Sequence, residues 1–133
     1  MMNSFYRRLL AIGSVLGAFG VIFGAFGAHY LKNRLEPTSL DIIRTGVLYL
    51  FIHVLALLFV VILGIKDENS RLLRSAGIFF ISGALLFSGS LFYIATESIT
   101  GLNIPFIGIL TPIGGLGFII GWGMLSLYPF SNK

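Results

Sequence analysis

The sequence has few charged residues. Only 11% of its 133 residues are Asp, Glu, Lys or Arg, whereas 56% are hydrophobic. Soluble domains carry about 25% charged residues, which cover much of their water-facing surface. A chain with so little charge cannot build that surface, and its mean hydropathy of +0.97 suits a lipid environment. The composition therefore predicts a single transmembrane domain over residues 1–133 and excludes an ordinary soluble protein.

The sequence also lacks cysteine. This absence excludes disulfides, thiolate metal sites, iron–sulfur clusters and cysteine nucleophiles. The net charge is +4, but the basic residues are scattered in short segments between apolar runs and form no stripe. Membrane orientation explains such a distribution better than nucleic-acid binding does. We therefore expect the lipid bilayer as the principal partner, and no nucleic acid.

Four long apolar stretches follow one another along the chain. They cover approximately residues 9–31, 44–65, 75–96 and 107–128. Each is close to the ~20 residues that a helix needs to cross a hydrocarbon core of ~30 Å. The second is the plainest, because no charged residue lies between Arg44 and Lys66. The pattern predicts an all-α integral membrane four-helix bundle.

The first stretch allows a second interpretation as a signal peptide, since Arg7 and Arg8 precede its apolar run. The run is longer than the ~7–15 apolar residues of such a signal. Small residues also recur along its whole length instead of marking one cleavage site. We therefore expect the segment to be retained as the first helix of the bundle.

The last stretch is less regular than the others. Thr111 and Pro112 resemble a helix N-cap followed by proline at the first helical position. Either the last helix begins there and is short, or it begins near Phe106 and is kinked. The sequence leaves both alternatives open.

The basic residues predict an orientation. Six fall on the side of the termini: Arg7, Arg8, Lys66, Arg71, Arg74 and Lys133. Three fall on the opposite side: Lys32, Arg34 and Arg44. Because cytoplasmic loops carry the excess of Lys and Arg, both termini are expected in the cytoplasm of a bacterial inner membrane. On the outer side, Arg44 could form an ion pair with Glu97.

Glycines are concentrated on particular helix faces when each helix is turned by ~100° per residue. Nine are expected to pack against neighbouring helices: Gly13, Gly17, Gly20, Gly24, Gly27, Gly89, Gly114, Gly117 and Gly121. Small residues let two backbones approach closely in a membrane. A second set in the first helix is expected to face lipid: Ile12, Phe19, Phe23 and Phe26. A spare glycine face could bind a second copy or another membrane protein.

His53 is the residue most open to a functional interpretation. It lies about nine residues into the second helix, which corresponds to ~13 Å of helix rise and a position near mid-membrane. Ionisable groups at that depth are candidates for function. The structural alternative is a neutral imidazole that is hydrogen-bonded to Tyr49 or to a serine of the third helix.

Several polar side chains make up a candidate polar seam: His29, Tyr49, His53, Ser88, Ser90, Tyr93 and Thr111. His29 lies near the outer end of its helix and differs from His53 in depth by ~10 Å, so the two cannot bind one metal ion. No serine has a base beside it in a recognisable nucleophile motif. We therefore predict no catalytic residues, no metal and no cofactor.

Four motifs carry a resemblance to a known family. They are Gly24-Ala25-Phe26-Gly27-Ala28-His29, Tyr49 with His53, Phe87-Ser88-Gly89-Ser90-Leu91, and Thr111-Pro112-Ile113-Gly114-Gly115 with Gly121-Trp122. Together they resemble domain-of-unknown-function family 423, small bacterial inner-membrane proteins of the YgdD and YwdK type, which is similar to eukaryotic transmembrane protein 256. In one departure, Phe92 replaces the tyrosine that usually follows the third motif, and Tyr93 comes next. The resemblance implies fold and location but no activity.

Two functions are compatible with these residues. The first is a non-enzymatic packing, assembly or stabilising component of the membrane. The second is a carrier or channel for a small solute, a proton or a lipid-like molecule, which would use the polar seam around His53. A water-filled cavity that reaches His53 would favour the second function, whereas a dry and fully packed seam would favour the first.

Overall fold

The computed structural model describes residues 2–131, so Lys133 lies outside the described chain. Its four long helices are α1 (Ser4–His29), α2 (Pro37–Lys66), α3 (Arg71–Thr100) and α4 (Leu110–Leu127). Short 3-10 turns follow or precede them: η1 (Leu31–Asn33), η2 (Ile107–Ile109) and η3 (Tyr128–Phe130). Each of the four helical segments is long and apolar enough to cross a membrane. The prediction of an all-α membrane-spanning bundle is confirmed.

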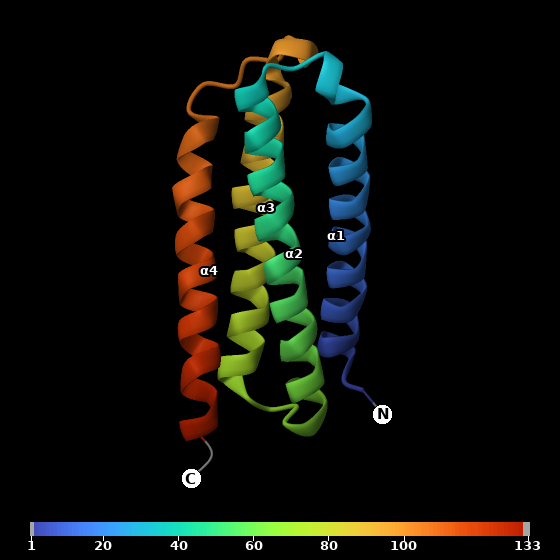
Figure 1. Ribbon diagram of the computed structural model, residues 1–133. Coiled ribbons are helices and arrows are strands. Elements are labelled where there is room, and N and C mark those ends of the chain that lie inside the picture. The colour runs from blue at the N-terminus through green and yellow to red at the C-terminus, as the bar shows by residue number, and fades with distance from the viewer. Residues whose placement is uncertain (1, 132–133) are drawn as a thin grey trace.

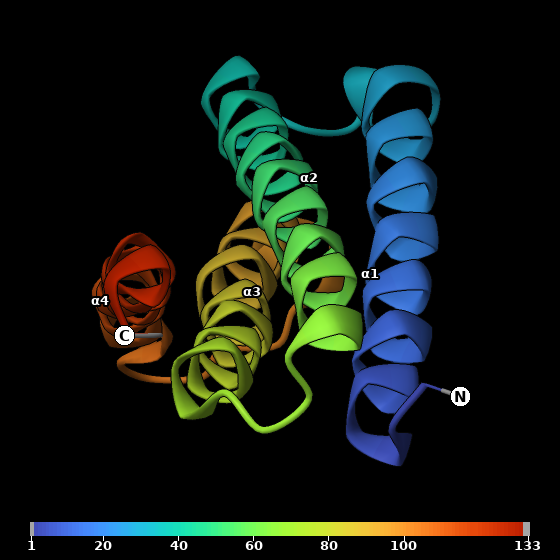
Figure 2. The same cartoon turned by 90° about the horizontal axis from the view of Figure 1, so that it is seen from below.

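The helices run alternately up and down, so both ends of the chain lie on the same side of the bundle (Figure 1). We call this side the terminal end, and the opposite side the distal end. Each helix packs mainly against its neighbour in the sequence, whereas the backbones of α1 and α3 come close to each other at few points. Seen from below, α1 and α4 therefore flank the central pair α2 and α3 (Figure 2). This open arrangement leaves grooves between helices that are not neighbours in the sequence.

The helices differ in length from the apolar stretches that predicted them. The helix expected at about 44–65 begins at Pro37, and that expected at about 75–96 covers Arg71–Thr100. Hydropathy marks only the part within hydrocarbon, whereas a helix continues until a cap or turn ends it. The Asn3 side chain caps α1 by accepting a hydrogen bond from the Phe5 N–H at 2.9 Å. Gly101, with φ of 66°, ends α3 in the left-handed conformation.

The start of α4 corrects the prediction for Thr111. The helix begins at Leu110, directly after the turn η2, so Thr111 lies inside the helix and is not its N-cap. Pro112 falls in the first turn, where backbone N–H groups have no partner within the helix. The proline therefore removes no intrahelical hydrogen bond. Of the two alternatives, the late start describes α4 better than an early start with a kink.

The glycine stripe of α1 faces α2. A Cβ atom added at Gly20 would lie 3.0 Å from the ring of Phe51, and one at Gly27 would lie 3.0 Å from Ile43. Gly13 is similarly close to Leu57, while Gly17 and Gly24 leave ordinary contact distances to α2. The opposite side of α1 is largely exposed, as expected for residues that face lipid.

Phe23 is an exception to the lipid-facing side of α1. Its ring is half-buried and stacks on Phe92 of α3, with ring centroids 4.2 Å apart and planes inclined by 11°. The expectation that Phe23 faces lipid is therefore wrong. The ring bridges α1 and α3 at a level where their backbones remain apart, because aromatic side chains are long enough to span such a gap.

The closest helix approach is between α3 and α4. A Cβ atom added at Gly117 would lie 3.4 Å from the Cα atom of Gly83, so glycine meets glycine across this interface. A Cβ at Gly114 would overlap the backbone nitrogen of Phe87, and one at Gly121 would lie 2.7 Å from the Phe80 ring. Such contacts between backbones supply the van der Waals packing that holds helices together in lipid.

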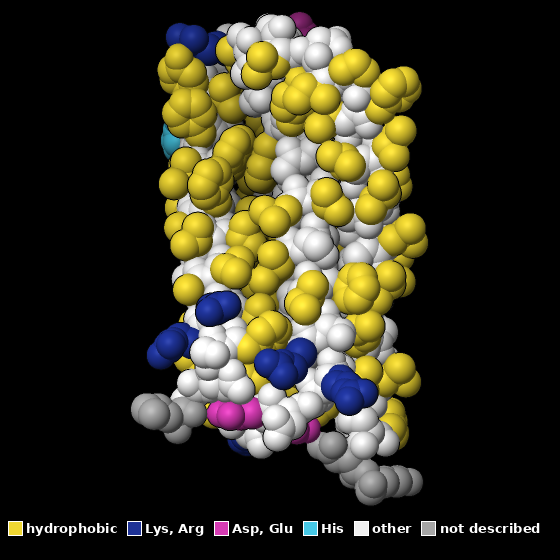
Figure 3. All heavy atoms as spheres, turned by 180° about the vertical axis from the view of Figure 1, so that it is seen from behind, with side chains coloured by type: hydrophobic (Ala, Val, Ile, Leu, Met, Phe, Trp, Pro, Cys, Tyr) yellow, Lys and Arg dark blue, Asp and Glu magenta, His cyan; other side chains and the backbone are white. Residues whose placement is uncertain are grey.

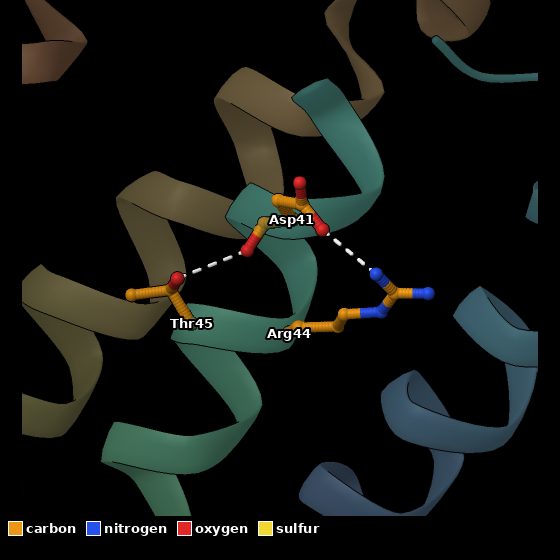
Figure 4. A network of polar contacts seen from close by, with 3 residues as sticks. All are labelled: Asp41, Arg44 and Thr45. Atoms are coloured by element: carbon orange, nitrogen blue, oxygen red, sulfur yellow. Dashed lines mark hydrogen bonds and ion pairs between the residues drawn. The ribbon is translucent and has the colours of Figure 1, made fainter. Parts of the chain in front are cut away.

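On the face shown in Figure 3, charged side chains lie at the two ends of the bundle and apolar side chains cover the middle. At the terminal end of this face the basic side chains gather in a band. At the distal end, Arg44 donates to Asp41 at 2.7 Å (Figure 4). The pairing of Arg44 with Glu97, considered from the sequence, is replaced by this local pair one turn away on the same helix.

The α3–α4 contact generates a test of packing. Gly114→Ala should destabilise the protein by about 1–3 kcal/mol, because a methyl group there overlaps the Phe87 backbone and forces the helices apart. Gly123→Ala, on the same helix, is the matched control because a Cβ at Gly123 meets nothing within 4 Å. Unfolding in detergent, followed by circular dichroism, measures both. Equal unfolding midpoints for the two variants would contradict the close approach.

Candidate functional site

One turn of α3, residues 87–90, connects the helices around it, and we call it the serine turn. Ser88 is 1% exposed, and its hydroxyl donates a 2.8 Å hydrogen bond to the main-chain carbonyl of Gly46 on α2. A Cβ atom at Gly46 would lie 2.7 Å from the Phe92 ring, so the absence of a side chain lets α2 lie against α3 here. The hydrogen bond satisfies a buried hydroxyl in a region without water.

Ser90 connects the same turn to α4. Its hydroxyl lies 2.9 Å from the Phe87 carbonyl oxygen and 2.7 Å from the Thr111 hydroxyl. A serine hydroxyl has one proton, and the carbonyl can only accept. If Ser90 donates to the carbonyl, Thr111 must donate to Ser90, which gives a chain of two hydrogen bonds. The first turn of α4 is thereby joined to α3 through side chains.

Gly89, between the two serines, has no intramolecular partner. A Cβ atom built on it would meet nothing within 4 Å. It lines a groove of about 520 Å³ that lies between α1 and α3, with apolar side chains of both helices as its walls. We call this the α1–α3 groove. The packing role expected of Gly89 is thus not fulfilled within the described chain.

His53 is buried near the middle of α2, with 5% of its surface exposed. Its Nδ1 atom lies 2.7 Å from the Tyr49 carbonyl oxygen one turn earlier. Because a carbonyl only accepts, Nδ1 must carry the proton in this contact. The imidazole stacks on the Phe118 ring of α4, with centroids 3.4 Å apart and planes inclined by 9°. The partner of His53 is therefore a backbone carbonyl and an aromatic face, and not a serine of α3.

The remaining seam residues are dispersed. Tyr49 is 40% exposed and stacks on Phe87 with centroids 4.7 Å apart. The Tyr93 hydroxyl donates to the Leu102 carbonyl at 2.8 Å and so attaches α3 to the loop that follows it. His29 is the exposed last residue of α1 at the distal end. The structure thus brings together Ser90 with Thr111 and Tyr49 with His53, but not the seam as a whole.

The chemistry available to these groups is limited. The hydroxyls of Ser88, Ser90 and Thr111 bond to main-chain carbonyls or to each other, and none of the three bonds to a histidine or a carboxylate. Nucleophilic catalysis needs a base within hydrogen-bond reach of the nucleophile. Within residues 2–131, no three His, Asp or Glu side chains are grouped so that they could hold a metal ion. The arrangement is suited to holding helices together.

The sequence did not single out two features of this region. Gly83 faces Gly117 and the Phe118 ring across the α3–α4 contact, and Phe118 covers His53. The alternation of small and aromatic residues on both helices was a signal for such contacts. This alternation can be interpreted only once α3 and α4 are known to face each other.

The sequence profile of the family described as "Protein of unknown function (DUF423)" matches residues 23–115. The chain belongs to the DUF423 family. The match includes His53, the serine turn and Thr111, but ends before Gly121 and Trp122. The resemblance that the four motifs indicated is therefore confirmed.

Individual proteins that are similar to this chain support its assignment to DUF423. The UPF0382 membrane protein of Haemophilus influenzae is 39% identical over 133 residues, which cover 99% of this chain and 98% of that protein. The UPF0382 membrane protein YwdK of Bacillus subtilis is 36% identical over 119 residues, with coverage of 90% and 93%. The UPF0382 inner membrane protein YgdD of Escherichia coli is 30% identical, with coverage of 90% and 86%. No solved structure matches the chain.

The hydrogen bond between Ser90 and Thr111 can be measured by a double-mutant cycle. Ser90→Ala and Thr111→Val should show a coupling energy of about 0.6 kcal/mol, the average for interhelical hydrogen bonds in a membrane protein, and at most about 1.7 kcal/mol. Unfolding in mixed micelles gives the four free energies. Ser90→Ala with Ser126→Ala is the control cycle, because Ser126 bonds within its own helix. A coupling no larger than that of the control would contradict the contact.

Proposed function

We propose that this DUF423 member is a non-catalytic assembly component of the membrane, whose α1–α3 groove receives a transmembrane helix of a second copy or of a larger complex. The observation that carries the proposal is Gly89. It stands in the serine turn at the edge of an open groove, where a side chain would meet nothing within 4 Å. Glycine in a helix interior destabilises the helix. Close packing by a helix of another chain against Gly89 would offset this loss of stability.

The wall that α3 contributes to this groove is suited to a helix. Gly89 and Thr96 line this groove seven residues apart on α3, and Ser82, seven residues before Gly89, lines a neighbouring groove between the same two helices. The Ser82 hydroxyl donates to the Phe79 carbonyl at 3.2 Å, and Thr96 donates to Phe92 at 2.8 Å. These three residues therefore present small groups whose polar atoms are already satisfied, while Leu85, Phe92 and Tyr93 line the groove beside Gly89 and Thr96. A seven-residue spacing matches the left-handed crossing that most membrane helix pairs adopt.

The geometry gives less support to a carrier or channel. A transport path would need its polar side chains to line one continuous, water-accessible cavity. Tyr49 and His53 line a groove of about 600 Å³ between α2 and α4, where the surrounding side chains are apolar and Phe118 covers the imidazole. Ser88 and Tyr93 line the α1–α3 groove. The polar seam is therefore divided between two sides of the bundle.

Gly89→Leu should dissociate the proposed complex without unfolding the chain, because the leucine fills the α1–α3 groove and displaces the incoming helix. The control is Gly123→Leu, which makes the same change at another glycine with open space around it, on α4. Blue-native electrophoresis and crosslinking in native membranes report the assembly. Purified protein tested in parallel distinguishes a second copy from a different partner. A strictly monomeric wild-type species in native membranes would overturn the proposal.

We further propose that the protein lies in a bacterial plasma membrane with both termini in the cytoplasm. Both ends of the chain lie at one end of the bundle, as Figure 1 shows. Five basic residues of the described chain also lie there: Arg7, Arg8, Lys66, Arg71 and Arg74. The distal end has three: Lys32, Arg34 and Arg44. An excess of this kind supports a cytoplasmic terminal end.

This orientation can be tested by fusing reporters to the full chain. A fluorescent protein that matures only in the cytoplasm should be bright at the C-terminus, whereas alkaline phosphatase, which needs export, should be inactive there. The same two reporters inserted into the distal loop after Gly101 should give the opposite pattern. Phosphatase activity at the C-terminus would reverse the orientation.

A further inference from the structure

A second groove lies between α1 and α2 at the distal end, on a different side of α1 from the α1–α3 groove. Its volume is about 530 Å³. On α1 it is lined by small residues, Gly24, Gly27 and Ala28, and on α2 by apolar side chains that include Val47 and Phe51. We call it the α1–α2 groove. Gly27 already packs against Ile43, so the slot between the two helices runs beside this contact, where Gly24 and Ala28 leave room because they lack bulky side chains.

Two cations line the same groove from different segments. Lys32 stands in the turn η1, directly after α1, and Arg44 stands two turns into α2. Among the described residues, Lys32 has no hydrogen bond or ion pair. Arg44 uses one nitrogen, Nη1, to bond Asp41, and its side chain remains 77% exposed. Figure 4 shows the Arg44 side chain extending from α2 toward α1.

We propose that the α1–α2 groove binds an anionic phospholipid, with its phosphate between Lys32 and Arg44 and one acyl chain in the slot below. Phe51 lies seven residues beyond Arg44, so the apolar lining continues ~10 Å deeper along the helix. Basic pockets between transmembrane helices on the cytoplasmic side of membranes bind the headgroups of anionic lipids, and the same attraction between cation and phosphate applies at the distal end. The position of the charges at the mouth and of the apolar walls beneath them matches the two parts of one lipid molecule.

Two other charged groups at this end, Asp41 and Arg34, bear directly on the proposal. Asp41 opposes it, because its carboxylate occupies one donor of Arg44 and repels a phosphate. Arg34 lies over the Tyr30 ring, 4.3 Å from its centroid, and does not line the groove. General attraction between a basic helix end and an anionic membrane would involve Arg34 as much as Lys32. Binding in the groove requires Lys32 and Arg44 but not Arg34.

The test uses the purified full chain in detergent and native mass spectrometry. The protein is mixed with equal amounts of phosphatidylglycerol and phosphatidylcholine that carry the same acyl chains. We expect bound phosphatidylglycerol in excess over phosphatidylcholine. Lys32→Ala and Arg44→Ala should each weaken phosphatidylglycerol binding about fivefold, the effect expected of one basic residue near an anionic headgroup. Arg34→Ala is the matched control and should change nothing.

Two further variants guard against an effect of misfolding. Asp41→Asn should strengthen phosphatidylglycerol binding, since it frees Arg44 and removes the opposing charge, and a gain of binding cannot come from a damaged fold. Ala28→Phe should block the slot from its exposed rim and reduce binding of the acyl chain. Ala25→Phe, also on the exposed surface of α1 but outside the groove, is its control.

Three results would overturn the proposal. Equal binding of phosphatidylglycerol and phosphatidylcholine would mean that the groove binds acyl chains but does not discriminate between headgroups. Loss of binding in Arg34→Ala as large as in Lys32→Ala would reduce the effect to general surface charge. Full displacement of the lipid by millimolar inorganic phosphate would identify a free anion, and not a lipid, as the ligand.

Discussion

The hydrogen bond from the Ser88 hydroxyl to the Gly46 carbonyl is the contact on which the packing around the serine turn depends. Hydrocarbon offers a buried hydroxyl no partner, so the bond must be made within the protein. It requires α2 and α3 to approach closely, and Gly46 permits this because the Phe92 ring occupies the space of a side chain there. With α3 fixed against α2, its other side is aimed at α4. Ser90 then bonds to Thr111, and Gly114 meets the Phe87 backbone.

The sequence predicted the membrane spans and the glycine face by which α1 packs on a neighbouring helix, but it did not predict which helices the other faces contact. Hydropathy identifies the segments that lie in hydrocarbon, and a period of 3.6 residues identifies which residues share a face. Neither identifies the helix that this face meets. Phe23 shares a face with lipid-exposed residues but is long enough to reach Phe92, and Thr111 resembles a cap but lies one residue inside α4. Both outcomes depend on how neighbouring helices are placed, which periodicity does not encode.

At the candidate site, too, periodicity does not identify the helix that each side chain contacts. The sequence did, however, permit one inference about the serines. Ser88 and Ser90 belong to one motif, and their proximity in the sequence suggested a common polar seam. Two residues apart on a helix correspond to a rotation of about 200°, so the two hydroxyls must point to different sides. In the structure they bond to α2 and α4, respectively. A motif that is polar in sequence therefore serves as a joint between helices, with Gly89 on the remaining side.

The two grooves beside α1 differ in what surrounds them. The α1–α2 groove has Lys32 and Arg44 at its mouth, whereas the polar groups that line the α1–α3 groove are uncharged. A lipid headgroup brings a charge that needs a counterion, while the backbone of a helix brings none outside its ends. The cations therefore favour lipid at the first groove, and the uncharged small residues favour a helix at the second. Since α1 is packed mainly against α2 alone, its two sides are free to be covered by these different occupants.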